Sequence, residues 1–231
     1  MHTITHDEYH PYAACLMFKQ CHDADTVRAN LKDLGIELSG ITDLIISHNH
    51  GDHTGGLLTL RGAFAGGDTL SRAHVGRGIF WPRPSNGRDM NGLLAFKADY
   101  ERGGGQFIEH SAAKEIAPGL WLTGPVPRVH PERNWSGSGR VQGPDGVVED
   151  TIPEDMSLVF DTPSGLVVLS GCGHAGIINT LEHARKIVRP APIHAAVGGF
   201  HLFAASDDHL AWTSKQLKGM GLQHFLGAHC T

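Results

Sequence analysis

Four side chains that bind metal ions well fall within six residues, in the run His-Asn-His-Gly-Asp-His at positions 48–53. Neutral imidazole and carboxylate groups are ligands that borderline divalent ions such as zinc and iron prefer. In an extended chain alternate side chains project the same way, so His48 and His50 can reach one ion together. Asp52 and His53 then face a second ion. The run therefore predicts a dinuclear metal site rather than a solvent loop that is rich in histidine by chance.

The flanks of this run indicate where it lies in the fold. The apolar residues 44–46 read as a short buried strand that ends at Ser47. Gly55 and Gly56 then permit a tight turn before a helix that we expect from Leu57. This order places the run on a loop at the carboxyl end of a strand, where open α/β sheets commonly bind ligands.

The same order of strand, glycine-rich loop and polar residue recurs three times downstream. Strands expected at 166–170, 193–197 and 223–226 lead to His174, His201 and His229, and helices are expected at 177–188 and 207–220. The first run does not fill two coordination shells alone, so further ligands are needed. We expect His174 and His229 to supply them. His201 is either a ligand or a substrate-binding residue.

The segment Ser47 to Leu57 resembles the signature of the metallo-β-lactamase fold superfamily. That resemblance implies an α/β (α+β) fold, an αββα sandwich in a single domain with two metal ions at one edge. Residues 122–128, 170–179, 198–202 and 229–231 are similar to a subgroup called metal-dependent hydrolases of the β-lactamase superfamily II. Proteins of that subgroup also carry the name 7,8-dihydropterin-6-methyl-4-(β-D-ribofuranosyl)-aminobenzene-5'-phosphate synthase.

The chain departs from the superfamily pattern at three places. Cys172 stands where the second strand commonly ends in an aspartate that bridges the metals; it is either a thiolate ligand or a buried structural cysteine. The common histidine of the third motif is absent near residues 120–128, so His174 is expected to replace it. Lys19 stands where an early aspartate is usual.

Size and composition fit one compact enzyme domain over residues 1–231. The chain has 40% hydrophobic residues, which suffice for a sizeable core. Its formal net charge of −5 argues against a nucleic-acid partner and favours a small-molecule substrate. No apolar run reaches the roughly 18 residues of a membrane helix, and the start does not resemble a signal peptide. We therefore expect a cytoplasmic protein with no membrane partner and reduced cysteines.

The middle of the chain, about residues 61–118, differs in character. Glycine and proline recur along it, so we expect an irregular insertion that covers the metal site. Arg83 and Arg88 of this segment, together with Arg128, are candidates for binding a phosphate or carboxylate of the substrate. A solvated surface with scattered charge is the alternative for the segment.

Metal chemistry suggests the reaction. A bound divalent ion lowers the pKa of its water from about 15.7 to about 7. We expect a metal-dependent hydrolase that uses this metal-bound hydroxide on a small ester, lactone, thioester or phosphoester, with Asp52 as the catalytic residue that orients the nucleophile. Two divalent ions are implied; zinc is favoured, and iron or manganese are alternatives. A dihydropterin-type transferase acting on a pyrophosphate substrate and a non-catalytic metal-binding scaffold are the other hypotheses.

Overall fold

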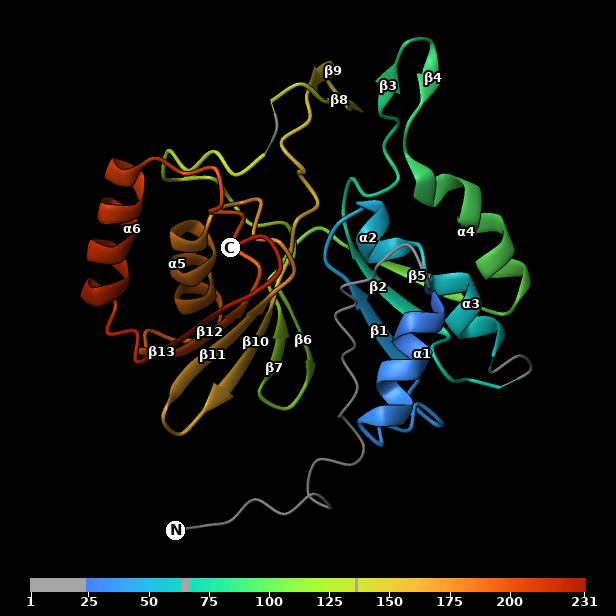
Figure 1. Cartoon of the computed structure of the whole chain (residues 1–231), viewed down its shortest axis with the longest axis horizontal. Coiled ribbons are helices and arrows are strands. Elements are labelled where there is room, and N and C mark those ends of the chain that lie inside the picture. The colour runs from blue at the N-terminus through green and yellow to red at the C-terminus, as the bar shows by residue number, and fades with distance from the viewer. Residues whose placement is uncertain (1–23, 64–66, 136) are drawn as a thin grey trace.

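Two β-sheets face each other, and helices cover the outer face of each sheet (Figure 1). This arrangement is seen in a computed structural model, which describes residues 24–63, 67–135 and 137–231. It is the predicted αββα sandwich, so the expected fold class is confirmed. The expectation about Lys19 lies outside the described residues, as do Cys15 and Cys21. Within the described part of the chain, no helix is long and apolar enough to cross a membrane.

The first sheet is parallel and has three strands. Its order is β1 (Asp43–Ile46), β2 (Arg72–Gly76) and β5 (Gln106–His110), and its helices are α1 (Ala24–Asp33), α3 (Leu57–Gly62) and α4 (Gly92–Arg102). Strand β1 is apolar on both faces. Leu44 and Ile46 pack in the cluster beneath the helices, whereas Ile45 packs toward the second sheet. Burial on both faces is why the strand reads as a continuous apolar run.

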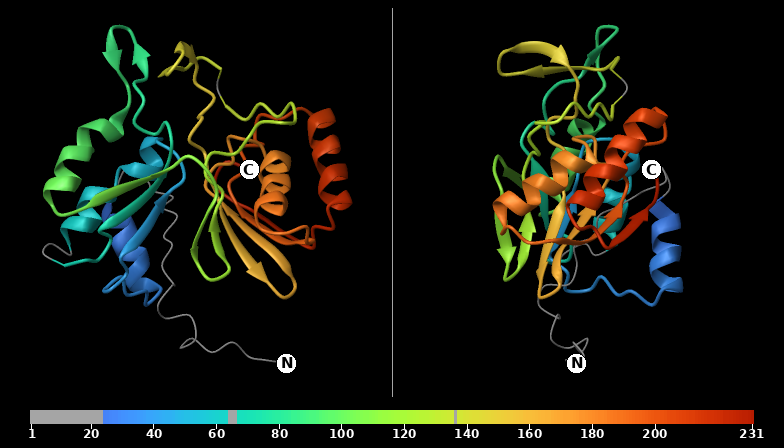
Figure 2. Two further views of the ribbon diagram at one scale, coloured as in Figure 1. Left: turned by 180° about the vertical axis from the view of Figure 1, so that it is seen from behind. Right: turned by 90° about the vertical axis from the view of Figure 1, so that its left-hand side faces the viewer.

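The second sheet is mixed and has six strands. Its order is β13 (His224–Gly227), β12 (Ile193–Gly198), β11 (Gly165–Ser170), β10 (Leu158–Thr162), β7 (Leu120–Leu122) and β6 (Lys114–Ala117). Helices α5 (Ile177–Ile187) and α6 (Asp207–Gly219) cover its outer face (Figure 2). Strands β11, β12 and β13 are parallel, so the loops that follow them lie at one end of the sandwich. The strands and helices expected downstream of residue 158 are confirmed within one or two residues.

The segment 61–118 is more regular than the sequence predicted. It contains β2 and β5 of the first sheet, β6 of the second sheet and helix α4, so an irregular insertion was the wrong description. Ala73 and Val75 of β2 are fully buried in the core beneath the helices of the first sheet, but His74 separates them, so the strand does not appear as an apolar run in the sequence. Its hairpin β3 (Pro84–Ser85) to β4 (Arg88–Asp89) projects from the sandwich, beside the hairpin β8 (Arg140–Gly143) to β9 (Gly146–Glu149) (Figure 1).

Candidate metal centre

The loop after β1 changes conformation within the histidine-rich run. His50 is extended, and the short helix α2 (Gly51–Thr54) begins directly after it. His48 and His50 therefore lie on one side of the change, and Asp52 and His53 lie on the helical turn. A Cβ at Gly55 would stand 2.8 Å from the carbonyl oxygen of Gly51, so this turn leaves no room for a side chain there.

Three histidines converge at the carboxyl ends of β1 and β11. His48, His50 and His174, here called the three-histidine group, each offer a ring nitrogen within 4.8 Å of the others. His48 Nε2 lies 3.0 Å from His50 Nδ1. His48 and His174 are buried, whereas His50 is partly accessible. The group is therefore enclosed on one side and open on the other.

These rings are neutral at ordinary pH. Burial, with the adjacent His53 and His174 rings, lowers the pKa of His48 well below its usual value. Burial also lowers the pKa of His50, and it lowers the pKa of His174 to about 3. A neutral imidazole has a free lone pair, which is the form that binds a metal ion.

The hydrogen bonds of His174 fit a metal ligand. Its Nδ1 lies 2.6 Å from the carbonyl oxygen of Asn134, so Nδ1 carries the proton and donates. Its Nε2 is buried and has no hydrogen-bond partner among the described residues. A buried nitrogen that lacks a partner is costly unless something fills the site. Both the tautomer and the orphaned atom fit a divalent ion in the three-histidine group.

A second cluster lies beside the first. Asp52, His53, Cys172 and His229, here called the four-ligand group, offer ligand atoms within 4.8 Å of one another. His53 Nε2 is 3.1 Å from Cys172 Sγ, 3.3 Å from His229 Nε2 and 3.4 Å from Asp52 Oδ2. The His48 and His53 ring centroids are 4.2 Å apart, so the two groups adjoin.

The chemistry of the four-ligand group also suits a borderline divalent ion. Carboxylate, thiolate and imidazole are all zinc ligands. A hydrogen bond with Cys230 and burial raise the pKa of the Cys172 thiol, so a metal ion would have to displace its proton. Within the part of the chain that the structure describes, Cys172 is a free cysteine. The side chains of Asp52 and His229 are 35% and 19% exposed, which leaves this group accessible to solvent.

Ser47 connects the two groups, a role that the sequence analysis missed. Its Oγ lies 3.0 Å from His48 Nδ1 and 3.5 Å from His53 Nδ1. A hydroxyl at this position can accept from both rings and direct both Nε2 atoms toward the ligand groups. Its place at a strand end, next to the histidine run, was the available signal. No local signal marked Asn134, which acts on His174 through its backbone carbonyl.

The remaining candidates belong to neither group. The His201 ring centroid is 4.5 Å from that of His174, but His201 belongs to neither group. Arg128 is mostly buried, donates to the carbonyl oxygens of Thr151 and Ile152, and lies over the Trp135 ring. Arg88 is exposed on β4.

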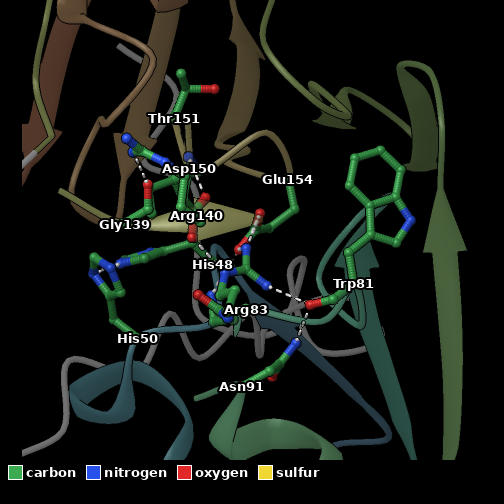
Figure 3. Close-up of polar contacts among 12 residues, drawn as sticks. His48, His50, Trp81, Arg83, Asn91, Gly139, Arg140, Asp150, Thr151 and Glu154 are labelled. Carbon is green, nitrogen blue, oxygen red and sulfur yellow. Dashed lines mark hydrogen bonds and ion pairs between the residues drawn. The ribbon is translucent and has the colours of Figure 1, made fainter. Parts of the chain in front are cut away.

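Arg83 is buried, and its charge is already paired. Its Nη2 donates to both carboxylate oxygens of Glu154 at 2.8 Å, and its Nε donates to Asp150 Oδ2 at 2.7 Å. Its Nη1 faces the carbonyl oxygens of Ile79 and Trp81. Figure 3 shows the guanidinium between these partners. This environment speaks against the predicted contact with substrate.

Comparisons with known proteins agree with this geometry. A family model described as Metallo-beta-lactamase superfamily matches residues 16–185. The chain is 28% identical over 223 residues to 7,8-dihydropterin-6-methyl-4-(beta-D-ribofuranosyl)-aminobenzene-5'-phosphate synthase of Methanocaldococcus jannaschii, covering 94% of this chain and 75% of that protein. An uncharacterized protein of the same organism is 28% identical over 224 residues, covering 94% and 78%.

A solved structure is similar over most of the chain. The crystal structure of Tm1679, described as a metal-dependent hydrolase of the beta-lactamase superfamily, matches with a TM-score of 0.69 and 29% identity. The match covers 92% of this chain and 75% of that one. The resemblance predicted from the motifs is therefore confirmed.

Proposed function

Because the chain belongs to the metallo-beta-lactamase superfamily, we propose that it is a metal-dependent hydrolase acting on a small ester, lactone, thioester or phosphoester. The observation that carries the proposal is the pair of adjoining ligand groups, one of which contains the orphaned Nε2 of His174. We assign one divalent ion to each group, with zinc as the favoured ion and iron or manganese as alternatives. A small molecule is the proposed partner.

Divalent ions bound in these groups would supply hydroxide near neutral pH and polarise a substrate oxygen. The residues of the chain set the geometry. His48, His53 and His174 are buried and present ring nitrogens to the two groups. Asp52 is partly exposed at the open side and contacts His229 at 3.0 Å, so its carboxylate can ligate and also orient the nucleophile.

The substrate approaches from the accessible side. His50, Asp52 and His229 reach solvent there, and His201 lies next to His174. We assign His201 to substrate binding rather than to a ligand group. Arg88, on the projecting hairpin, remains the candidate for a substrate phosphate or carboxylate, because Arg83 and Arg128 already donate to partners within the chain.

A second candidate is a dihydropterin-type transferase acting on a pyrophosphate substrate. The 28% identity with the Methanocaldococcus jannaschii synthase, across 94% of this chain, favours it. In this case the same ligand groups would hold the ions that activate a pyrophosphate leaving group. Release of pyrophosphate from a dihydropterin substrate would distinguish it from hydrolysis of simple esters.

The test is a substrate panel on protein loaded separately with zinc, iron or manganese, with and without a chelator. We expect hydrolysis of one ester class, loss with chelator, and recovery when the metal is returned. His194→Ala is the matched control for histidine removal, since His194 is a partly exposed residue of β12 that hydrogen bonds to Gln223 outside both groups. Hydrolysis that persists in chelator-treated, metal-free protein would contradict the proposal.

A further inference from the structure

Three consecutive residues, 154–156, lie against the loop that carries His48. Glu154 Oε1 accepts a hydrogen bond of 3.2 Å from the backbone N–H of Asn49. The backbone N–H of Met156 donates to the carbonyl oxygen of Ser47 at 3.1 Å. These two bonds fix the backbone on both sides of His48.

Asp155, the middle residue of the three, faces the loop after β11 that carries His174. Asp155 Oδ2 accepts a hydrogen bond of 2.8 Å from the backbone N–H of Ala175, which follows His174 directly. The backbone N–H of His174 also interacts with this carboxylate. Neighbouring side chains of one short segment thus hold the ligand loop of the first sheet and the ligand loop of the second.

Both carboxylates are buried, at 0% exposure for Glu154 and 1% for Asp155. A buried carboxylate is costly unless hydrogen bonds and an opposite charge compensate it. Arg83 supplies that charge to Glu154 through two contacts of 2.8 Å (Figure 3). The positive charge of Arg128 acts on Asp155. Arg83, which the sequence suggested for substrate binding, is thereby explained as the partner of Glu154.

Backbone packing also fixes the segment. A Cβ at Gly76, the last residue of β2, would stand 2.0 Å from the carbonyl oxygen of Glu154. The end of β2 therefore touches the segment with no side chain between them. Contact with β2 and hydrogen bonds to both ligand loops leave residues 154–156 little freedom to move.

We propose that Glu154 and Asp155 are positioning residues that hold the His48 loop and the His174 loop together, so that the three-histidine group is assembled before an ion binds. The inference rests on the proposed function only in taking this group as a metal site. Outer-shell partners that orient ligands typically change metal affinity or activity by about 10–100-fold when they are mutated. Here the ligands are oriented through their backbone rather than through their rings.

The test uses Glu154→Gln and Asp155→Asn in the full chain, which keep size but remove charge, together with the truncations Glu154→Ala and Asp155→Ala. The control is Asp43→Asn, which changes a partly exposed carboxylate–arginine pair between Asp43 and Arg72 at the far end of β1, away from both ligand groups. Zinc affinity is measured by competition with a chromophoric chelator. The absorption spectrum of the cobalt-loaded protein reports ligand geometry, and thermal unfolding of the metal-free protein reports stability.

We expect each alanine variant to weaken the zinc bound by the three-histidine group by about 10–100-fold, with an altered cobalt spectrum. The Gln and Asn variants, which can still accept from the backbone, should restore part of that affinity. Asp43→Asn should bind zinc as the wild type does. Any loss of activity in the variants should appear in kcat more than in KM.

The inference is overturned if the folded Gln, Asn and Ala variants keep wild-type affinity and spectrum, even when their unfolding temperature falls. An equal loss in Asp43→Asn would also overturn it. If the alanine variants fail to fold, the same comparison is made on Glu154→Gln and Asp155→Asn, whose wild-type affinity and spectrum would then contradict it. A wild type that binds zinc but hydrolyses nothing overturns the proposed function alone, whereas one that binds no metal overturns both.

Discussion

The three-histidine group and the four-ligand group adjoin, yet they differ in the chemical type of their ligands and in the contacts that hold those ligands in place. The first offers three neutral nitrogens. The carbonyl oxygen of Asn134 accepts a hydrogen bond from His174, and the carboxylates of Glu154 and Asp155 accept from the backbone of its two loops. The second offers a carboxylate and a thiol in addition to two imidazoles, and two of its members are partly exposed. Two metal ions in these groups would therefore occupy unequal environments.

The difference in ligand number has a chemical consequence. Four protein ligands can complete a tetrahedral zinc shell, whereas three leave one position for water or substrate, as in catalytic zinc sites. An ion in the three-histidine group would therefore be the one with an open coordination position. The four-ligand group would hold its ion more completely and contribute charge to the shared site.

The largest effect is expected from His50→Ala. The variant removes one of only three ligands from the three-histidine group, so we expect that group to lose its ion. Activity should fall by more than about 100-fold, beyond the usual cost of losing an outer-shell partner. Metal analysis and kcat/KM, measured beside His194→Ala, check this. Turnover at the wild-type rate in His50→Ala would contradict the assignment.

A smaller effect is expected at Cys172, where one of four ligands changes. Cys172→Ala should weaken the ion in the four-ligand group while the three-histidine group keeps its own. Cys172→Asp supplies the carboxylate that is usual at this position in the superfamily and should restore binding. Separate zinc affinities for the two groups measure the effect. Identical affinities in the wild type and Cys172→Ala would mean that the thiol is structural.

The candidate ligands could be identified from the sequence because their signal is local. His48, His174 and His229 each follow a short apolar strand within a few residues, so strand and loop can be recognised together. The supporting residues give no such signal. Glu154 bonds to a backbone group 105 residues away, and Asp155 to one 20 residues away. In the sequence alone, buried acidic residues of this kind resemble a solvated pair.

Residues 61–118 were wrongly predicted to be irregular because their strands also lack a local signal. Strand β2 contains His74 between its buried Ala73 and Val75, and β5 begins with an exposed Gln106. Their apolar character is too weak to mark them as strands. They become strands because β2 pairs in parallel with β1 on one side and with β5 on the other, and this pairing is not visible locally.

Proton release should distinguish the two groups. The pKa values of His48, His50 and His174 are lowered, so above about pH 6.5, the ordinary histidine value, these rings are already neutral and bind a metal without releasing a proton. The pKa of Cys172 is raised, so its thiol must lose one proton when a metal binds. Zinc affinity should therefore rise with pH at the four-ligand group and stay nearly constant at the other. Calorimetry in buffers of different ionisation enthalpy measures this, and proton release unchanged in Cys172→Ala would contradict it.

The smallest expected effect concerns Ser47, whose hydroxyl lies near one histidine ring of each group. Ser47→Ala removes the hydroxyl near His48 Nδ1 and His53 Nδ1 without removing a ligand. We expect both zinc affinities to fall by about tenfold, at the low end of outer-shell effects. Ser47→Thr, which keeps the hydroxyl, serves as the control. A loss confined to one group would show that Ser47 orients only that ring.

The most direct measurement is a zinc titration of the metal-free wild type beside His174→Ala and Cys172→Ala. Two adjoining, unequal groups predict two equivalents in the wild type. Each variant should lose or weaken a different one: the ion of the three-histidine group in His174→Ala and the ion of the four-ligand group in Cys172→Ala. A single equivalent in the wild type, or loss of the same equivalent in both variants, would contradict the account.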